Sequence, residues 1–258
     1  AERTANQIIR LELEETLDNS SIFAGSLEYT MINQLNILDQ DTYDGLGTIA
    51  DDPSFIVIQD LTDEDSPRVN YFDVGEDGVA TQVADQEEAP SHSGIVSFDL
   101  DTYKIADTVV VELTDPDLNV DSDLLDIFTT VSAVGDPARD AVGLAGLPSQ
   151  TRALDDFSFG PLGRLLDITF DDEIWTDPSV NCAAADASGL FNLGLDDTGF
   201  TLVETEEASG RFLGDFQIPD RYCQSATGNL VSVTGTDIEV NYVDFRDASG
   251  EIIEVGDS

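Results

Sequence analysis

Apolar and polar residues alternate along much of the chain. Every second position is apolar in residues 9–13, 27–31, 109–113 and 238–242, and the positions between them are largely polar. A period of two with one polar face is typical of half-buried antiparallel strands. Polar turn clusters, such as residues 18–21 and 207–210, separate these stretches at the spacing found in β-sandwiches. The pattern predicts an all-β fold.

An internal repeat adds to this picture. One set of residues occurs twice, 189 positions apart. The first copy is Glu15-Thr16, Ser20, Phe23, Gly25 and Leu27, and the second is Glu204-Thr205, Ser209, Phe212, Gly214 and Phe216. The shared pattern predicts a β-hairpin: a strand, a polar turn, and a second strand opened by Phe and Gly. A second match follows in the same order, because Val69-Asn70-Tyr71 with Asp73 corresponds to Val240-Asn241-Tyr242 with Asp244.

The two copies differ in what precedes the hairpin. A long strand-rich stretch, residues 94–200, comes before the second copy, whereas only fourteen residues come before the first. We therefore expect the first unit to lack its N-terminal half. The chain is then an excerpt from a longer array, and residues outside it, or a neighbouring chain, complete the first domain.

The charge balance is strongly acidic. The sequence has 54 Asp and Glu residues against 10 Lys and Arg residues, a formal net charge of −44. Such a surface repels nucleic acid and anionic lipids and attracts cations. Its self-repulsion weakens in salt, because the Debye length falls from about 10 Å at 0.1 M to about 3 Å at 1 M. The alternative is a halophile protein with an ordinary intracellular task.

Two cysteines, Cys182 and Cys223, favour one disulfide and hence an oxidising, extracellular setting. The alternative is a pair of free buried thiols. Asn19-Ser20-Ser21 is a glycosylation sequon, which makes Asn19 a candidate glycan site in the same setting. No apolar run approaches the ~18 residues that a membrane-spanning helix needs, so no transmembrane segment is expected in this chain.

Three segments resemble a known family. Residues 94–99 (GIVSFD), 103–108 (YKIADT) and 115–119 (DPDLN) are similar to the immunoglobulin-like repeats of surface-layer proteins from ammonia-oxidising archaea of the Nitrosopumilus type. The hairpin motif, the V-N-Y-x-D strand and the closing residues 243–250 also resemble these repeats. The resemblance implies tandem immunoglobulin-like β-sandwiches in an extracellular, self-assembling lattice on the cell surface.

The domain organisation follows from the repeat and the resemblance together. We expect residues 1–80 to be the C-terminal part of one immunoglobulin-like domain, 81–93 a linker, 94–247 an elaborated second domain, and 248–258 the start of a further linker. The second domain exceeds the usual size, and its surplus is expected as a loop between Gly135 and Gly163.

One acidic stretch has metal-ligand spacing. Side chains with oxygen ligands occupy every second position from residue 115 to residue 121, as Asp115, Asp117, Asn119 and Asp121. Counted from Asp115 as position 1, Asp123 and Asp126 fall at positions 9 and 12 of a calcium loop. Val120 replaces the turn glycine, and Asp126 replaces the bidentate glutamate. The first four residues are the candidate Ca²⁺ ligands. The alternative is a solvated loop held by Asp and Asn turn bonds.

Catalysis is not expected. The single histidine, His92, lies between two serines in the predicted linker and is expected to be exposed, and the chain lacks the GxSxG and HExxH motifs. The expected function is structural: an envelope protein that forms a lattice with its own copies and concentrates cations, including ammonium and divalent metals. The alternatives are a calcium-dependent secreted adhesin and, more remotely, a polysaccharide-processing enzyme with two paired carboxylates.

Overall fold

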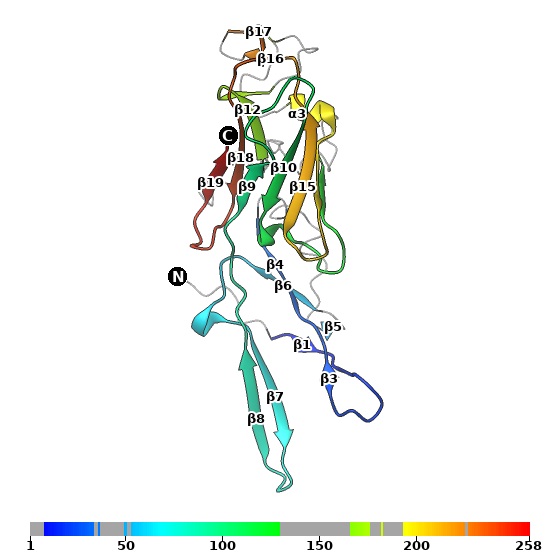
Figure 1. The fold of residues 1–258 in the computed structure, drawn as a ribbon. Helices are drawn as coiled ribbons and strands as arrows, with labels where there is room; N and C mark the ends of the chain where they lie inside the picture. The colour runs from blue at the N-terminus through cyan, green and yellow to red at the C-terminus, as the bar shows by residue number, and fades with distance from the viewer. Residues whose placement is uncertain are drawn as a thin grey trace. The chain divides into compact units, whose positions relative to one another are not determined.

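The computed structural model describes residues 8–33, 36, 49–50, 53–129, 166–175, 182, 193–224 and 227–258. These residues form an all-β protein with several small sheets (Figure 1). Helix in the described part is limited to the 3₁₀ turns η1 (Asp63–Asp65) and η2 (Pro116–Leu118) and to α3 (Leu193–Thr198). The all-β expectation is confirmed. The expected loop between Gly135 and Gly163 lies outside the described residues.

The chain divides into two compact units. Unit 1 comprises Ala1–Ile32, Gln40–Ser91 and Ala248–Gly250, and unit 2 comprises Asn33–Asp39, His92–Asp247 and Glu251–Ser258. Strands occupy two stretches that were expected to be linkers. Strand β8 (Ala80–Gln86) pairs with β7 (Arg68–Val74), and β19 (Ile253–Asp257) pairs with β18 (Ile238–Asp244). These polar stretches form strands because each folds back on the V-N-Y-x-D strand that precedes it.

Unit 2 contains two larger sheets, both antiparallel. The five-stranded sheet has the order β11-β14-β15-β10-β9, and the four-stranded sheet has the order β13-β12-β18-β19. The strands not yet given are β9 (Ile95–Phe98), β10 (Thr108–Thr114), β11 (Ile127–Thr129), β12 (Leu166–Phe170), β13 (Glu173–Ile174), β14 (Thr201–Glu204) and β15 (Arg211–Gln217). A separate hairpin joins β16 (Arg221–Gln224) to β17 (Asn229–Ser232).

The core of unit 2 collects the alternating apolar positions of both larger sheets. Val109, Val111 and Leu113 of β10 are fully buried, and so are Val240 and Tyr242 of β18. Phe212 and Phe216 of β15 and Leu166 and Ile168 of β12 belong to the same cluster. The predicted strand periodicity is confirmed here, because burial of one face is what the alternation encodes.

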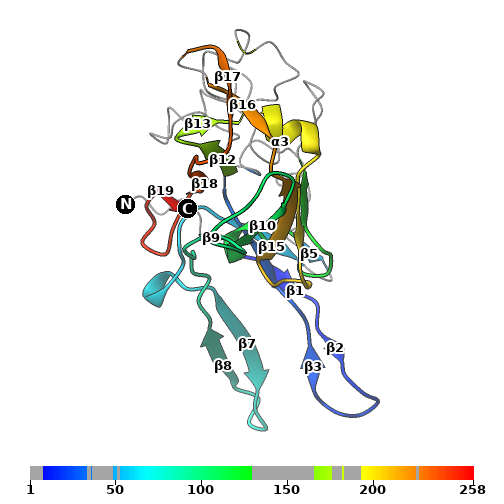
Figure 2. The same ribbon diagram turned by 45° about the horizontal axis from the view of Figure 1, so that its top comes forward.

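The described strands of unit 1 form pairs. The pairs are β1 (Arg10–Leu11) with β5 (Ile49–Ala50), β2 (Glu14–Glu15) with β3 (Phe23–Ala24), β4 (Glu28–Met31) with β6 (Ser54–Val57), and β7 with β8. Its buried cluster is small and centres on Met31, Val57 and Ala89. Every residue of β7 is exposed, and Figure 2 shows β7 and β8 as a two-stranded ribbon.

The 189-residue repeat is reproduced in the backbone of the two hairpins. Glu15 pairs with Phe23 across β2 and β3, and Glu204 pairs with Phe212 across β14 and β15. In the turns, Thr16 bonds Ser20 as Thr205 bonds Ser209. The carboxylate oxygen Oε1 of Glu15 accepts from the amide of Ser21 at 2.8 Å, and that of Glu204 accepts from the amide of Gly210 at 2.8 Å. Both turns also have two residues with positive φ at matching positions: Asn19 and Ser21, and Ala208 and Gly210.

The second sequence match is also structural. Across β7 and β8, Val69 pairs with Asp85 and Tyr71 pairs with Val83. Across β18 and β19, Val240 pairs with Asp257 and Tyr242 pairs with Val255. The asparagine between them faces a small residue in each copy, Ala84 or Gly256. Units 1 and 2 therefore contain two copies of the same pair of hairpins.

Candidate functional site

A cluster of buried carboxylates lies where several elements of unit 2 meet. Asp115 follows β10, Asp117 lies in η2, and Asp244 ends β18. Asp115, Asp117 and Asp244 are 1 %, 5 % and 1 % exposed, respectively. An ionised carboxylate is costly to bury without partners, so each of them needs hydrogen-bond donors. Asp115 and Asp244 are 129 residues apart in the sequence, so their spacing does not predict that they lie close together.

The hydrogen bonds of Asp115 come from its own turn and from β18. The amide of Asp117 donates to Asp115 Oδ1 at 2.9 Å, which caps η2. The phenol of Tyr242 donates to Asp115 Oδ2. Both oxygens of Asp115 are therefore occupied by donors of the protein itself.

Asp117 and Asp244 are satisfied in the same way. The amide of His92 donates to Asp117 Oδ2 at 2.9 Å, and His92 Nδ1 lies 2.7 Å from Asp117 Oδ1. The amide of Gly94 donates to Asp244 Oδ2 at 2.8 Å, and the amide of Arg246 donates to Asp244 Oδ1 at 2.9 Å. All six oxygens of the three carboxylates thus have partners, so the cluster ties the start of β9 and the end of β10 to β18.

The glycine at position 94 is required by this arrangement. A Cβ atom added there would lie 2.2 Å from Cε1 of the Tyr242 ring. His92 is also placed differently from the expectation that it is exposed. Its side chain is about one-third exposed, because the ring packs beside Asp117. The linker composition around His92 gave no signal of this pairing.

Burial raises the acid pKa values in the cluster. The pKa of Asp115 rises to about 7, mainly because of desolvation and next because of the charge of Asp244. The pKa of Asp244 rises to about 6, again chiefly through desolvation. Desolvation also raises the pKa of Asp117, although the hydrogen bonds from His92 act in the opposite direction. Burial, with Asp115 close by, raises the pKa of Tyr242 well above its ordinary value. With a pKa of about 7, Asp115 gains or loses its proton near neutral pH, and Asp244 does so at a slightly lower pH.

The four predicted calcium ligands are divided between two environments. Asp115 and Asp117 face into the cluster, where their oxygens are already bonded. The amide nitrogen of the Asn119 side chain lies 3.4 Å from Ser122 Oγ, and Asp121 accepts from the amide of Asp123 at 2.9 Å. In the described part of the chain, no group of three or more His, Cys, Asp or Glu residues is arranged to hold a metal ion. The calcium site stays a prediction.

Asp126, the last acid of the loop, contacts the repeated hairpin. The amide of Val120 donates to Asp126 Oδ2 at 2.6 Å, and the amide of Asp126 donates to Glu204 Oε2 at 3.1 Å. Glu204 is only 2 % exposed, since it also caps its own turn. Desolvation raises the pKa of Asp126. These carboxylates thus connect the 120–126 loop to β14.

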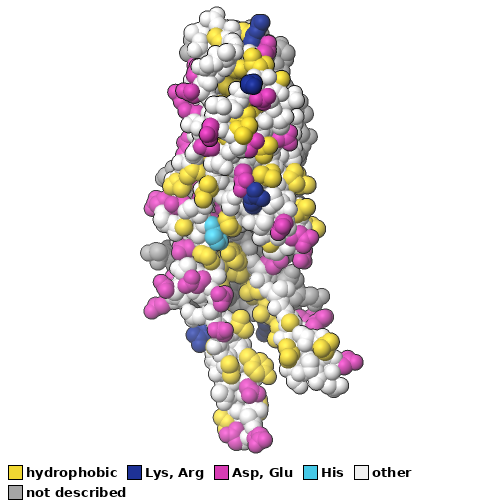
Figure 3. All heavy atoms as spheres, in the orientation of Figure 1, with side chains coloured by type: hydrophobic (Ala, Val, Ile, Leu, Met, Phe, Trp, Pro, Cys, Tyr) yellow, Lys and Arg dark blue, Asp and Glu magenta, His cyan; other side chains and the backbone are white. Residues whose placement is uncertain are grey.

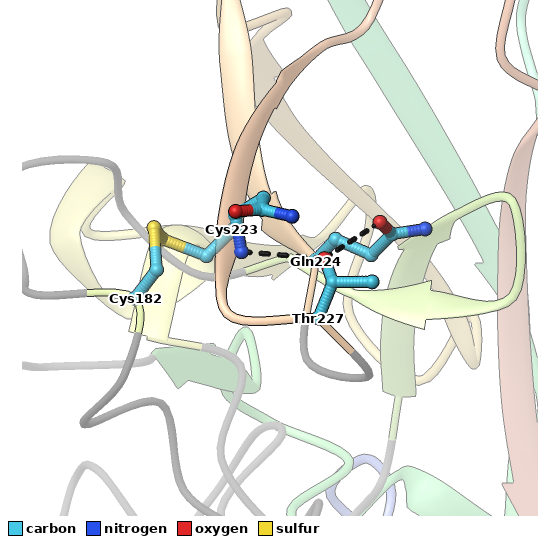
Figure 4. The surroundings of a disulfide bond; sticks show 5 residues. Cys182, Cys223, Gln224 and Thr227 are labelled. Atoms are coloured by element: carbon cyan, nitrogen blue, oxygen red, sulfur yellow. Dashed lines mark hydrogen bonds between the residues drawn. A yellow bond between two sulfur atoms is a disulfide. The ribbon is translucent and has the colours of Figure 1, made fainter.

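The predicted disulfide between Cys182 and Cys223 is present, with Cα atoms 5.1 Å apart. Figure 4 shows it joining Cys182 to strand β16, beside Gln224, which accepts a hydrogen bond from the Thr227 hydroxyl at 2.9 Å. Cys223 is completely buried. The cross-link closes a loop of 41 residues, and this constrains the unfolded chain.

The candidate glycan site is accessible. Asn19 is exposed in the turn between β2 and β3 and has a φ of 58°, a left-handed conformation that asparagine tolerates well. The hydroxyl of Ser20 bonds within the turn. Glycosylation of Asn19 stays a prediction.

Acidic side chains are spread over the face shown in Figure 3, and few Lys or Arg side chains lie between them. Arg211 forms two hydrogen bonds with Glu112, at 2.6 and 2.8 Å, and Arg221 lies 3.6 Å from Asp220. With ten basic residues in the sequence, most of the 54 acids have no basic residue to pair with. Exposed carboxylates of this density attract mobile cations.

Among the described helices, none has the length and apolar character needed to cross a membrane. In comparisons with known proteins, no family model matches the chain, and no curated protein matches it at a significant level.

Proposed function

We propose that this chain is a structural module of an extracellular cell-surface lattice, and that its acidic surface concentrates cations. The observation that carries the proposal is the net charge of −44 on a chain built from repeated β-hairpins. Catalytic chemistry does not require such a charge, whereas a porous lattice uses a uniform sign of charge to exclude anions and to enrich cations.

The division of carboxylates supports this proposal. In the described part of the chain, four acids are buried, Asp115, Asp117, Asp244 and Glu204, and they are bonded inside unit 2 and maintain its fold. Most of the other acids in these described residues are exposed to solvent and its ions. Ammonium and divalent metals are the cations that such walls would enrich, and nitrite is an anion that they would repel.

The finer features of the proposal fit one setting. Tandem immunoglobulin-like domains, a disulfide and a glycan on Asn19 are all compatible with an extracellular array. The pairing of one large antiparallel sheet with another around a common core in unit 2 supports the immunoglobulin-like assignment.

Assembly tests the proposal. The purified chain is imaged by electron microscopy in CaCl₂, in MgCl₂ and in NaCl at matched ionic strength. Sheets or tubes in the divalent salts support a lattice module, because divalent cations can bridge acidic neighbours. Particles that stay monomeric in every salt contradict it and favour a secreted adhesin, which would then bind a receptor as a single chain.

Permeation tests the role of the charge. Across assembled sheets, ammonium is expected to cross faster than nitrite at low ionic strength, and this preference is expected to fade as added salt screens the carboxylates. Equal permeation of the two ions at low salt would remove the support for cation enrichment.

A further inference from the structure

The two copies of the hairpin pair differ in what covers them. Tyr242 and Val240 of unit 2 are 1 % and 0 % exposed, whereas the matching Tyr71 and Val69 of unit 1 are 62 % and 52 % exposed. Phe212 is completely buried, and the matching Phe23 is 57 % exposed. The same strands therefore present a buried face in one unit and an open face in the other.

In unit 2, one segment covers both hairpins. Strand β10 pairs along β15 and places Val109, Val111 and Leu113 opposite Phe216, Gly214 and Phe212. The residues of unit 1 at these three β15 positions are Leu27, Gly25 and Phe23. Among the described residues, β3 has only β2 as a ladder partner, so its other edge is open to an added strand.

Strand β9 and the end of β10 are then fixed by three side chains of β18 and β19. Asp244 accepts from the amide of Gly94 at 2.8 Å, Asp257 accepts from the amide of Phe98 at 2.8 Å, and Tyr242 donates to Asp115. The matching residues of unit 1 are Asp73, Asp85 and Tyr71, and all three are exposed. Unit 1 thus retains the groups that hold a β9–β10 segment in unit 2.

We propose that unit 1 is a strand-acceptor site, whose ligand is an extended polypeptide segment with the pattern of residues 92–118. The segment adds along the free edge of β3, its alternating apolar residues cover Phe23 and Val69, and its amides are captured by Asp73 and Asp85. Main-chain pairing supplies affinity, and the aspartates and Tyr71 supply register. The proposal depends on the internal repeat and not on the proposed lattice function.

One difference between the copies sharpens the test. Gly210 of unit 2 touches the turn after β10 so closely that a Cβ atom there would lie 2.5 Å from Pro116 Cα. The matching residue of unit 1 is Ser21, which also has a positive φ of 56°. A ligand with the Asp115-Pro116 turn is therefore expected to bind more tightly when Ser21 is replaced by glycine.

The experiment measures binding of a labelled synthetic peptide, residues 92–118, to the intact chain by fluorescence anisotropy in buffer free of divalent ions. We expect saturable binding to the chain and none for a scrambled peptide or for the Val111→Pro peptide, because proline removes a ladder donor. Tyr71→Ala and Asp73→Asn are expected to weaken binding about tenfold or more, since a lost charge-assisted hydrogen bond is worth roughly 1.5–3 kcal/mol. Ser21→Gly is expected to strengthen it.

The control variant is Asp101→Asn, which makes the same change at an exposed acid of unit 2. It is expected to bind the peptide as the parent chain does. Two binding results overturn the proposal. One is that the 92–118 peptide binds no better than the scrambled peptide, and the other is that neither Tyr71→Ala nor Asp73→Asn changes its binding. Self-association in which β7 becomes protected without any peptide also overturns it, because the occupant would then be a second copy. Sheet formation in divalent salt is scored separately, so loss of peptide binding leaves the lattice proposal standing.

Discussion

The phenol of Tyr242 donates a hydrogen bond to the carboxylate of Asp115, which lies 127 residues earlier in the chain and is 1 % exposed. This contact connects the four-stranded sheet to the turn that follows β10. The same strand position in unit 1 holds the exposed Tyr71. Substitutions of Tyr71 and Tyr242 therefore compare the effect on stability of the same side chain without and with this contact.

Replacing Tyr242 by phenylalanine is expected to destabilise unit 2 by about 1–3 kcal/mol, because Asp115 loses a donor in a buried site. Trp175 is the only tryptophan, and it is buried in the core of unit 2, so its fluorescence reports unfolding of that unit in urea. The matched control, Tyr71→Phe, is expected to leave the midpoint unchanged. Equal midpoints for the two variants would show that the contact contributes nothing.

Unit 2 is expected to lose stability as the pH rises from about 4 to about 7. The pKa of Asp115 is raised to about 7 and that of Asp244 to about 6 in the folded state, so the folded state binds more protons than the unfolded state across this window. Stability is therefore greatest below the window and lowest above it. The measurement is the urea midpoint of Trp175 fluorescence between pH 4 and pH 8.

A variant separates this effect from general repulsion among the surface acids. Asp115→Asn removes the main titrating group, and its stability is expected to fall less steeply with pH than that of the parent chain. Asp215→Asn, at an exposed position of β15, is the control and is expected to keep the parent slope. If the two variants have the same slope, the buried cluster is not the source of the pH dependence.

Part of this architecture is readable from the sequence. The period of two identified β10 and β18, because one face of each strand is buried in a common core. The repeat identified the hairpins, since the turn bonds of Glu15 and Glu204 depend on local residue types. The resemblance to surface-layer repeats stays a prediction.

The buried cluster was not predictable in the same way. The spacing of Asp115 and Asp117 suggested metal ligands. In the structure, however, Asp115 bonds Tyr242 and Asp117 bonds His92, and both partners lie outside the acidic loop in the sequence. Long-range pairing of this kind has no periodic signature. The one available signal was the V-N-Y-x-D match, which marked Tyr242 and Asp244 as parts of a repeated unit without giving their partners.

Calcium and magnesium are expected to stabilise the chain equally at the same ionic strength, because diffuse screening of surface carboxylates does not depend on coordination geometry. Thermal unfolding in the two chlorides is the measurement. A specific rise with calcium that disappears in Asp121→Asn would instead establish the 115–121 loop as a calcium site, and Tyr242 and His92 would then have to release their carboxylates.

Removing the disulfide is expected to lower the free energy of unfolding of unit 2 by about 4 kcal/mol, the chain-entropy value for a loop of 41 residues. The measurement compares urea unfolding of the parent chain with and without dithiothreitol. The double variant Cys182→Ala/Cys223→Ala is the control, in which the reductant is expected to have no further effect. A parent chain whose stability is insensitive to reduction would contradict the expectation.

One strand pair occurs twice in the chain, with a buried face in unit 2 and an exposed face in unit 1. Hydrogen–deuterium exchange of the chain alone compares Arg68–Val74 with Ile238–Asp244 in a single experiment. Strand β18 is bonded on both sides, by β12 and β19, whereas β7 pairs only with β8 among the strands that the structure describes. We predict that amides of β18 exchange at least about a hundredfold more slowly than those of β7. Equal protection of the two strands would contradict the claim that this strand pair is covered in unit 2 and open in unit 1.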